Sequence, residues 1–79
     1  MLADAPSLEQ LYRQHGHAVF DRCRYLLGDD DAAWDATQEV FLKADKGRHG
    51  FEGRSSWHTW LSRIATHHCL NVLRSQKVR

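Results

Sequence analysis

The chain lacks the features of a membrane, secreted or disulfide-rich protein. No apolar run approaches the roughly 20 residues needed to span a bilayer. The first six residues have neither the charged nor the apolar segment of a signal peptide. The two cysteines, Cys23 and Cys69, form no C-x-x-C pair, which favours reduced structural thiols over a disulfide or metal pair. We therefore expect a soluble cytoplasmic protein without a metal or other cofactor.

A large net charge is also missing. At a formal charge of +1, the whole molecule does not attract nucleic acid, so any such binding must come from local charge. The charges are in fact segregated along the chain. Residues 29–39 hold five acidic side chains and no Lys or Arg, and residues 54–79 hold five Lys or Arg and no carboxylate side chain. An acidic and a basic region indicate two different partners.

Repeats, low-complexity tracts and strand-like alternation are absent, and helical periodicity accounts for nearly the whole chain. Ser7 and Gln10 form a capping box at the start of a first helix. Gly28 is placed to end that helix as a C-cap. Gly16 lies inside the helix and can break it in two.

Two further helices follow from the same signals. The acidic cluster at 29–31 supplies the N-cap of a second helix that reaches about Asp45. Three glycines mark the next loop, and Ser55 or Ser56 then caps a third helix that reaches about Gln76. The predicted fold is all-α, a small bundle of three helices, or of four if Gly16 breaks the first.

Each predicted helix has an apolar face, and together these faces form the one small core that a chain of this length allows. The expected core residues are Leu8, Leu11, Tyr12, His15, Val19, Cys23, Leu26 and Leu27 on the first helix, Ala33, Trp34, Ala36, Thr37, Val40, Phe41 and Ala44 on the second, and Trp57, Leu61, Ile64, Ala65, His68 and Val72 on the third.

One stripe of the second helix faces away from this core. Its members, at steps of three and four residues, are Asp35, Gln38, Glu39 and Leu42. Solvation alone explains the three polar residues. Leu42, however, places a large apolar side chain among them, and an apolar anchor ringed by polar groups is typical of a partner-binding surface.

A second stripe lies beside the buried face of the third helix and holds no carboxylate. Its members are Trp60, Arg63, His67, Asn71 and Arg74. Guanidinium groups pair with phosphates, Asn can hydrogen-bond to base edges, and Trp can stack on bases. Trp57, one turn before Trp60, is expected in the core, whereas Trp60 lies at its border and is expected to touch nucleic acid.

Catalysis finds little support in the sequence. No serine lies in a nucleophile elbow. The adjacent residues His67, His68 and Cys69 point about 100° apart on a helix, so they cannot chelate one ion together. A zinc site would need both cysteines and histidines from elsewhere in the chain. We expect no enzyme activity, and a metal- or redox-responsive module is a distant hypothesis.

Four segments, taken in order, resemble region 2, the N-terminal domain, of bacterial sigma factors of the extracytoplasmic-function (ECF) group. They are LY at 11–12, LLGD at 26–29, D-x-x-QEVFL at 35–42 and GRSSW-x-TWL-x-x-IA at 53–65. The likeness runs from about Ser7 to Arg74. It implies a helical domain at 7–76, between a disordered N-terminus at 1–6 and a basic tail at 77–79.

The resemblance also implies a function for each stripe. The second helix would dock on the β′ clamp helices of RNA polymerase through Asp35, Gln38, Glu39 and Leu42. The loop and third helix would recognise and melt the promoter −10 element, capturing a flipped base of the non-template strand. The implied DNA contacts are Lys46, Arg48, His49, Arg54, Ser55, Ser56, Trp57, Trp60, Arg63, His67, Asn71 and Arg74. An anti-sigma protein is a further candidate partner, and no membrane partner is expected.

The sequence departs from the family pattern at three of the relevant positions. The family often has Asn where this chain has His67, Asp where it has Asn71, and an aromatic residue where it has Asp45, so promoter preference does not transfer. Asp45 would also repel phosphate unless it pairs with Lys46 or Arg48. These departures support an alternative hypothesis, a sigma-fold interaction module that binds an anti-sigma factor without reading DNA.

The family's −35-binding helix-turn-helix domain is not among these 79 residues. We therefore expect the chain to be one domain of a longer or truncated factor. Alone, it should bind DNA weakly and with a strong dependence on salt, because few phosphates are contacted.

Overall fold

The computed structural model describes residues 6–51, 53 and 55–77, apart from the side chains of His49 and Lys77. Outside the described residues lie 1–5 of the predicted disordered N-terminus, 78–79 of the predicted basic tail, and the predicted DNA contact Arg54. The described chain forms three α-helices, α1 (Leu8–Leu27), α2 (Asp30–Gly47) and α3 (Trp57–Lys77), with a short 3₁₀ turn, η1 (Arg48–Gly50), after α2. The prediction of an all-α bundle is confirmed.

The helix ends use the predicted capping residues. The Ser7 side chain accepts a hydrogen bond from the Gln10 backbone N–H, and the Gln10 side chain accepts one from the Ser7 N–H, which completes the capping box. Gly28 ends α1 at φ +78°, a left-handed conformation that favours glycine. The Asp29 carboxylate accepts from the N–H of Ala32 at the start of α2.

The start of α3 is capped by Ser56, the second of the two predicted candidates. Its hydroxyl accepts a hydrogen bond from the Thr59 backbone N–H at 3.1 Å. The helix runs one residue past the predicted end, and α2 runs two residues past its predicted end to Gly47. Differences of this size are usual at helix ends, where the last turn is the least constrained.

Gly16 does not break α1, so the bundle has three α-helices rather than four within the described residues. The glycine is buried, and the ring of Tyr12 lies over it, one turn earlier on the same helix. A Cβ added at Gly16 would stand 3.5 Å from that ring. Local packing of the Tyr12 ring and burial of this turn therefore offset the weak helix propensity of glycine here.

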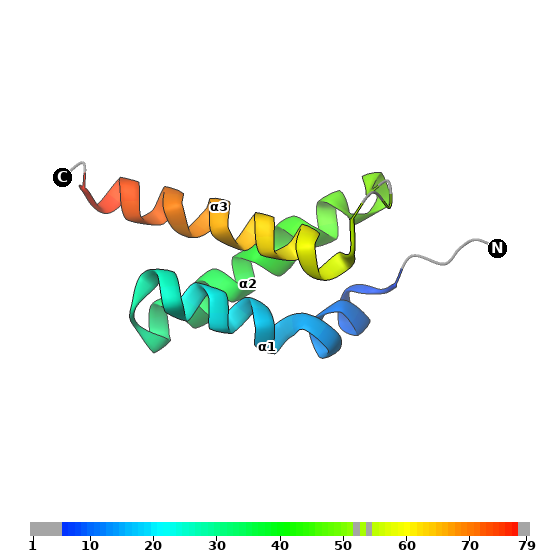
Figure 1. Ribbon diagram of the computed structural model, residues 1–79, viewed down its shortest axis with the longest axis horizontal. Coiled ribbons are helices and arrows are strands. Elements are labelled where there is room, and N and C mark those ends of the chain that lie inside the picture. The colour runs from blue at the N-terminus through cyan, green and yellow to red at the C-terminus, as the bar shows by residue number, and fades with distance from the viewer. Residues whose placement is uncertain (1–5, 52, 54, 78–79) are drawn as a thin grey trace.

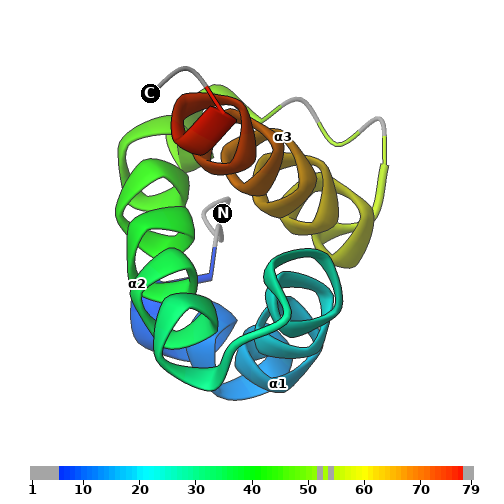
Figure 2. The same cartoon turned by 90° about the vertical axis from the view of Figure 1, so that its left-hand side faces the viewer.

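The three helices lie side by side around one core (Figures 1 and 2). In Figure 2, which looks along the bundle, α1, α2 and α3 occupy the corners of a triangle. α1 packs most extensively against the other two helices, and the contact between α2 and α3 is the smallest of the three. No described helix is long and apolar enough to cross a membrane.

The core is built from small and aliphatic side chains of all three helices. Its buried apolar residues are Leu11, Val19, Cys23, Ala33, Ala36, Val40, Phe41, Ala44, Leu61, Ala65 and Cys69. Thr37 is also buried, and its hydroxyl donates to the Ala33 carbonyl at 2.7 Å. Most of the predicted core is confirmed.

The prediction that Tyr12 and Trp34 lie in the core is wrong, since each is 46% exposed. Both lie at the α1–α2 boundary, where one side of the ring packs and the other faces solvent. The Tyr12 ring meets the Phe41 ring edge-on at 5.1 Å between centroids, and the Trp34 ring lies 4.6 Å from that of Phe20. Large aromatics gain from such one-sided packing without full burial.

The two cysteines are free and buried, on α1 and α3. Burial, together with a hydrogen bond to Cys23, raises the pKa of the Cys69 thiol to about 12. A thiol with so high a pKa is almost wholly protonated at neutral pH and therefore a poor nucleophile or metal ligand. Cys23 and Cys69 thus pack as small apolar side chains, as predicted.

Candidate functional site

The predicted stripe on α2, here called the α2 patch, consists of Asp35, Gln38, Glu39 and Leu42, and all four side chains are exposed. Leu42 is 54% exposed, a high value for a leucine in the middle of a helix. Covering this side chain with a partner would remove its apolar surface from water, which is favourable. The structure therefore agrees with the predicted exposure of the patch.

Trp34 adjoins the α2 patch, although the sequence predicted it in the core. It stands one turn before Gln38 and is supported from behind by Phe20 of α1. Helical periodicity places Trp34 at the edge of the apolar face of α2. The periodicity of one helix does not show how far the neighbouring helix covers that edge. The patch therefore has two large apolar side chains, Leu42 within it and Trp34 at its rim.

The predicted stripe on α3, here called the α3 stripe, consists of Trp60, Arg63, His67, Asn71 and Arg74. All are exposed except Trp60, which is partly buried. The Arg74 guanidinium donates to the Asn71 side-chain oxygen at 3.3 Å, a contact within the stripe. The stripe keeps its cationic character on the surface.

Three aromatic rings join the loop after α2 to the start of α3. The Phe51 ring lies 4.0 Å from that of Trp57 and 5.2 Å from that of Trp60, between centroids, and the two Trp rings meet edge-on at 5.3 Å. The ring of Trp60 also covers Gly47, where an added Cβ would stand 3.5 Å from it. Trp57 is partly buried against the core, as predicted, and Trp60 is partly buried against it as well.

Arg48, predicted to contact DNA, is held within the protein. Its guanidinium donates to the Asp45 carboxylate at 3.2 Å and to the Pro6 carbonyl at 2.8 Å, and its side chain is 19% exposed. The contact to Pro6 ties the segment before α1 to the end of α2. Asp45 thus has one of the two expected partners, which reduces its repulsion of a phosphate. Because its guanidinium is partly buried and already hydrogen-bonded, Arg48 is less available to a DNA phosphate than the sequence indicated.

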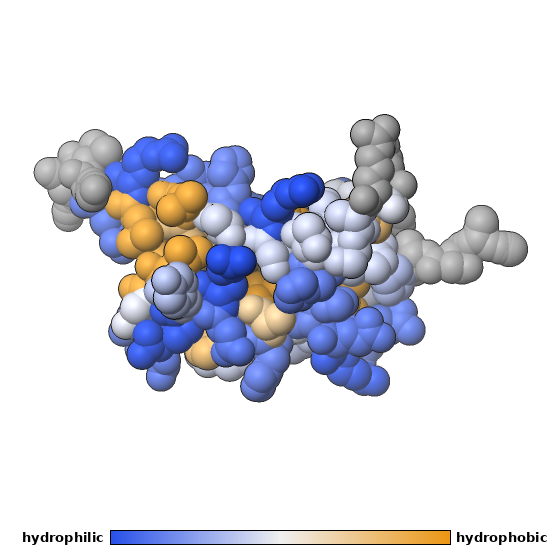
Figure 3. Space-filling model, viewed as in Figure 1, coloured by the Kyte–Doolittle hydropathy of each residue, from blue (hydrophilic) through white to orange (hydrophobic). Residues whose placement is uncertain are grey.

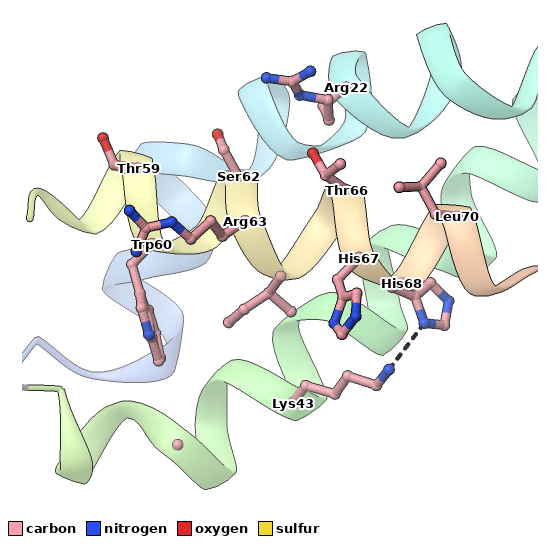
Figure 4. A pocket seen from close by; sticks show the side chains of 12 residues that line it. Arg22, Lys43, Thr59, Trp60, Ser62, Arg63, Thr66, His67, His68 and Leu70 are labelled. Atoms are coloured by element: carbon pink, nitrogen blue, oxygen red, sulfur yellow. Dashed lines mark hydrogen bonds between the residues drawn. The ribbon is translucent and has the colours of Figure 1, made fainter.

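A shallow, open groove of about 940 Å³ runs along α3. Figure 4 shows Thr59, Ser62 and Thr66 on the flank toward Arg22 of α1, and Trp60, His67 and His68 on the flank toward Lys43 of α2. Among the described residues, the lining contains no Asp or Glu. A hollow surface with cations and an aromatic ring is suited to an anionic, planar ligand such as a nucleotide strand.

An apolar area covers the end of the bundle where α3 finishes (Figure 3). Leu70, 44% exposed, and Leu73 line a shallow groove there with Arg74 and Gln76.

Within the described residues, no group of three or more His, Cys, Asp or Glu side chains is arranged to hold a metal ion.

Two histidines at helix–helix contacts have lowered pKa values. Partial burial, and to a lesser degree the nearby His58, lowers the pKa of His15, whose ring centroid lies 6.3 Å from that of His58. Partial burial and the Lys43 ammonium lower the pKa of His68, and Glu39 opposes this shift. Both imidazoles are therefore held in the neutral form more strongly than in the unfolded chain.

These lowered pKa values predict that the fold loses stability in mild acid. Below the ordinary histidine pKa of about 6.5, the unfolded chain binds protons that folded His15 and His68 do not yet accept. The free energy of unfolding therefore falls as the pH drops through that value toward the folded pKa values. Urea unfolding followed by circular dichroism at a series of pH values measures this slope.

A matched pair of variants tests the assignment. The double variant His15→Gln and His68→Gln keeps polar side chains that do not titrate, so it should have a flatter slope than the parent. Gln14→Ala, at an exposed position on α1 that carries no titratable group, should leave the slope unchanged. Equal slopes in the parent and the double variant would contradict the prediction.

The predicted DNA contacts fall into three groups. Exposed and available are Lys46, Ser56, Arg63, His67, Asn71 and Arg74, and partly buried are Arg48, Ser55, Trp57 and Trp60. Arg54 and the side chain of His49 lie outside the described residues. Lys43 was missed, because its place in the α3 groove depends on a contact with His68, 25 residues away.

A comparison with protein families matches residues 11–79 to sigma-70 region 2. Among curated proteins, the chain is 44% identical over 57 residues to the ECF RNA polymerase sigma factor SigG of Mycobacterium tuberculosis, a match that covers 72% of this chain and 15% of that protein. It is 32% identical over 71 residues to the ECF RNA polymerase sigma factor SigX of Bacillus subtilis, covering 90% of this chain and 37% of the relative.

A third relative is the RNA polymerase sigma factor YlaC of Bacillus subtilis, 39% identical over 72 residues and matched over 86% of this chain and 39% of its own length. The chain thus spans well under half the length of these relatives. No solved structure matches the chain at the significance required of these comparisons.

Proposed function

This chain belongs to the sigma-70 region 2 family of ECF sigma factors, and on that basis we propose that it is a transcription initiation domain. It would act without enzymatic chemistry in the cytoplasm, by joining the RNA polymerase core to promoter DNA. The observation that carries the proposal is the separation of two surfaces. The carboxylate-bearing α2 patch and the carboxylate-free α3 stripe lie on different helices, as two partners of different chemistry require.

The α2 patch is the proposed surface for RNA polymerase, at the β′ clamp helices. Leu42 would fill an apolar site on the clamp, and Asp35, Gln38 and Glu39 would form a polar rim around it. Trp34 lies at the same edge and would extend the apolar part of the contact. Because the four side chains of the patch are exposed, they can bind a partner without any change in the core.

The α3 stripe and the loop before it form the proposed surface for the non-template strand of the −10 element. Arg63 and Arg74 would contact phosphates, and the exposed part of the Trp60 ring would stack on an unpaired base. The packing of Trp60 on Gly47 and Phe51 holds its ring in place before DNA arrives. A preordered ring loses less entropy on binding, which helps to repay the unstacking of the base.

Titration with labelled single-stranded oligonucleotides of the −10 type tests the DNA surface. Changing one base at a time should reveal at least one position at which the affinity falls by about tenfold, since a good hydrogen-bonded contact to a base edge contributes roughly 1–3 kcal/mol of discrimination. The double variant Trp60→Ala and Arg63→Ala should weaken binding at low salt to all of these strands. Fluorescence anisotropy gives the dissociation constants.

Arg13→Ala serves as the control, because it removes a positive charge from the exposed surface of α1. It should bind as the parent does. Unchanged affinity of the double variant at low salt would exclude the DNA surface proposed here, provided that circular dichroism shows the variant to be folded.

One observation favours the alternative function, a sigma-fold module that binds an anti-sigma factor without reading DNA. Arg48, which should face DNA, donates to Asp45 and Pro6 instead. In that case the oligonucleotide series would show the same affinity for every base. A partner protein would still bind the domain.

A further inference from the structure

Lys43 and His68 form a side-chain contact across the smallest of the three helix interfaces. The Lys43 ammonium donates to Nδ1 of His68 at 3.1 Å, which requires a neutral ring with its proton on Nε2 (Figure 4). The Lys43 side chain is otherwise exposed at the groove between α2 and α3. An ammonium has three N–H donors, so Lys43 can bind an anion whether or not it still donates to His68.

The groove beside this contact has the form of a nucleotide site. Trp60 covers Gly47 at one end, and Lys43 lies four residues before Gly47 on α2, which is about 6 Å along the helix axis. Ile64 stands one turn from Trp60 and one turn from His68 on α3 and lines the same groove. An apolar surface formed by Trp60 and Ile64 therefore lies next to the Lys43 ammonium. In a nucleotide, a planar base likewise lies next to an anionic phosphate.

We propose that Lys43 binds one backbone phosphate of a single-stranded nucleic acid in the groove between α2 and α3, with His68 as a second, proton-linked ligand. The proposal rests on the proposed DNA function, because it specifies where on the α3 side the strand lies. Lys43 belongs to neither the α2 patch nor the α3 stripe. It would extend the strand's contact surface from α3 onto α2.

The charges around His68 explain why its proton would be linked to binding. Partial burial, and to a lesser degree Lys43 from α2, disfavours a protonated imidazole, whereas Glu39 from α2 favours one. Arg22 of α1 and Arg63 of α3 line the same groove and add positive charge, and the titratable His67 of α3 lines it as well. A phosphate beside Lys43 would offset these cations and favour protonation of His68. The Nδ1–H of the protonated ring would then donate to the phosphate, in place of the hydrogen bond that Nδ1 accepts from Lys43 in the free state.

The test measures binding of a labelled −10-type single strand by fluorescence anisotropy. Lys43→Gln should weaken binding by about three- to tenfold, as expected for one charge-assisted hydrogen bond at a partly open site. The slope of log affinity against log salt should become shallower by about 0.7, the value for one phosphate contact on a single strand.

A scan with a single neutral methylphosphonate linkage locates the phosphate. In the parent, neutralising one particular linkage should weaken binding, and the same linkage should have no further effect in Lys43→Gln. His68→Gln should lose part of the gain in affinity that the parent shows between about pH 7.5 and about pH 5.5.

Arg13→Gln is the charge-matched control, since it removes one cation from the exposed surface of α1, outside the residues that line the groove. It should change the affinity by less than about twofold. If Lys43→Gln weakens binding no more than Arg13→Gln does, or if no linkage is coupled to Lys43, the phosphate site is excluded while the DNA function stands. If the parent binds no strand at low salt, the DNA function fails and the phosphate site fails with it.

Discussion

Replacing Leu42 with glutamate should abolish binding of the chain to the β′ clamp helices of RNA polymerase and leave its helical fold intact. The side chain is 54% exposed and takes no part in the buried core, so the folded domain tolerates a charge there. In the complex, the new carboxylate would lie in a dry apolar contact without a partner. Central interface residues of this kind contribute about 2 kcal/mol or more, so the affinity should fall by roughly 30-fold or more.

The measurement is a binding titration of the chain with a β′ clamp-helix fragment. Leu70→Glu makes the same change at a comparably exposed leucine on α3 and should bind the clamp normally. Glu39→Lys, which reverses a charge within the α2 patch, should lose binding as Leu42→Glu does. Normal clamp binding by Leu42→Glu and Glu39→Lys would show that the polymerase surface lies elsewhere.

Leu61→Ala should give the largest loss of stability among simple truncations of α3. Leu61 is fully buried in the core shared by the three helices. Removing a buried leucine side chain lowers the free energy of unfolding by about 2–5 kcal/mol, because transfer and cavity terms add. A chain of 79 residues has only about 4–12 kcal/mol in total, so the variant should be close to unfolding at room temperature.

Thermal and urea unfolding followed at a helix-sensitive wavelength measure this loss. Leu70→Ala removes the same atoms from an exposed position nine residues further along α3. It should change the free energy of unfolding by less than about 0.5 kcal/mol. Similar losses in both variants would mean that α3 does not pack on α1 and α2 through the face described.

The local signals in the sequence were sufficient for the helices and for most of the core. Capping by Ser7 and the left-handed C-cap at Gly28 depend on residues at most four positions apart, so the sequence contains them directly. The α2 patch was found by the same reasoning, since helical spacing alone decides which side chains of one helix share a face. Its exposure in the structure follows from that geometry.

Contacts between distant residues could not be predicted in this way. Arg48 donates to the carbonyl of Pro6, 42 residues away, and Lys43 on α2 contacts His68 on α3, 25 residues away. Trp34 has a helical position suited to burial, but α1 covers only one side of its ring. In each case the outcome depends on how far one helix extends over another, which no single-helix pattern records.

The turn between α1 and α2 has a consequence for the order of folding. Only Gly28 and Asp29 separate Leu27 from Asp30, whereas the segment between Gly47 and Trp57 is much longer. Closing a short loop costs less chain entropy and takes less time, so we expect α1 and α2 to form a helical hairpin first. α3 would then dock on it. The helix proposed to read DNA would be the last to join the fold, and the first to separate when the domain begins to open.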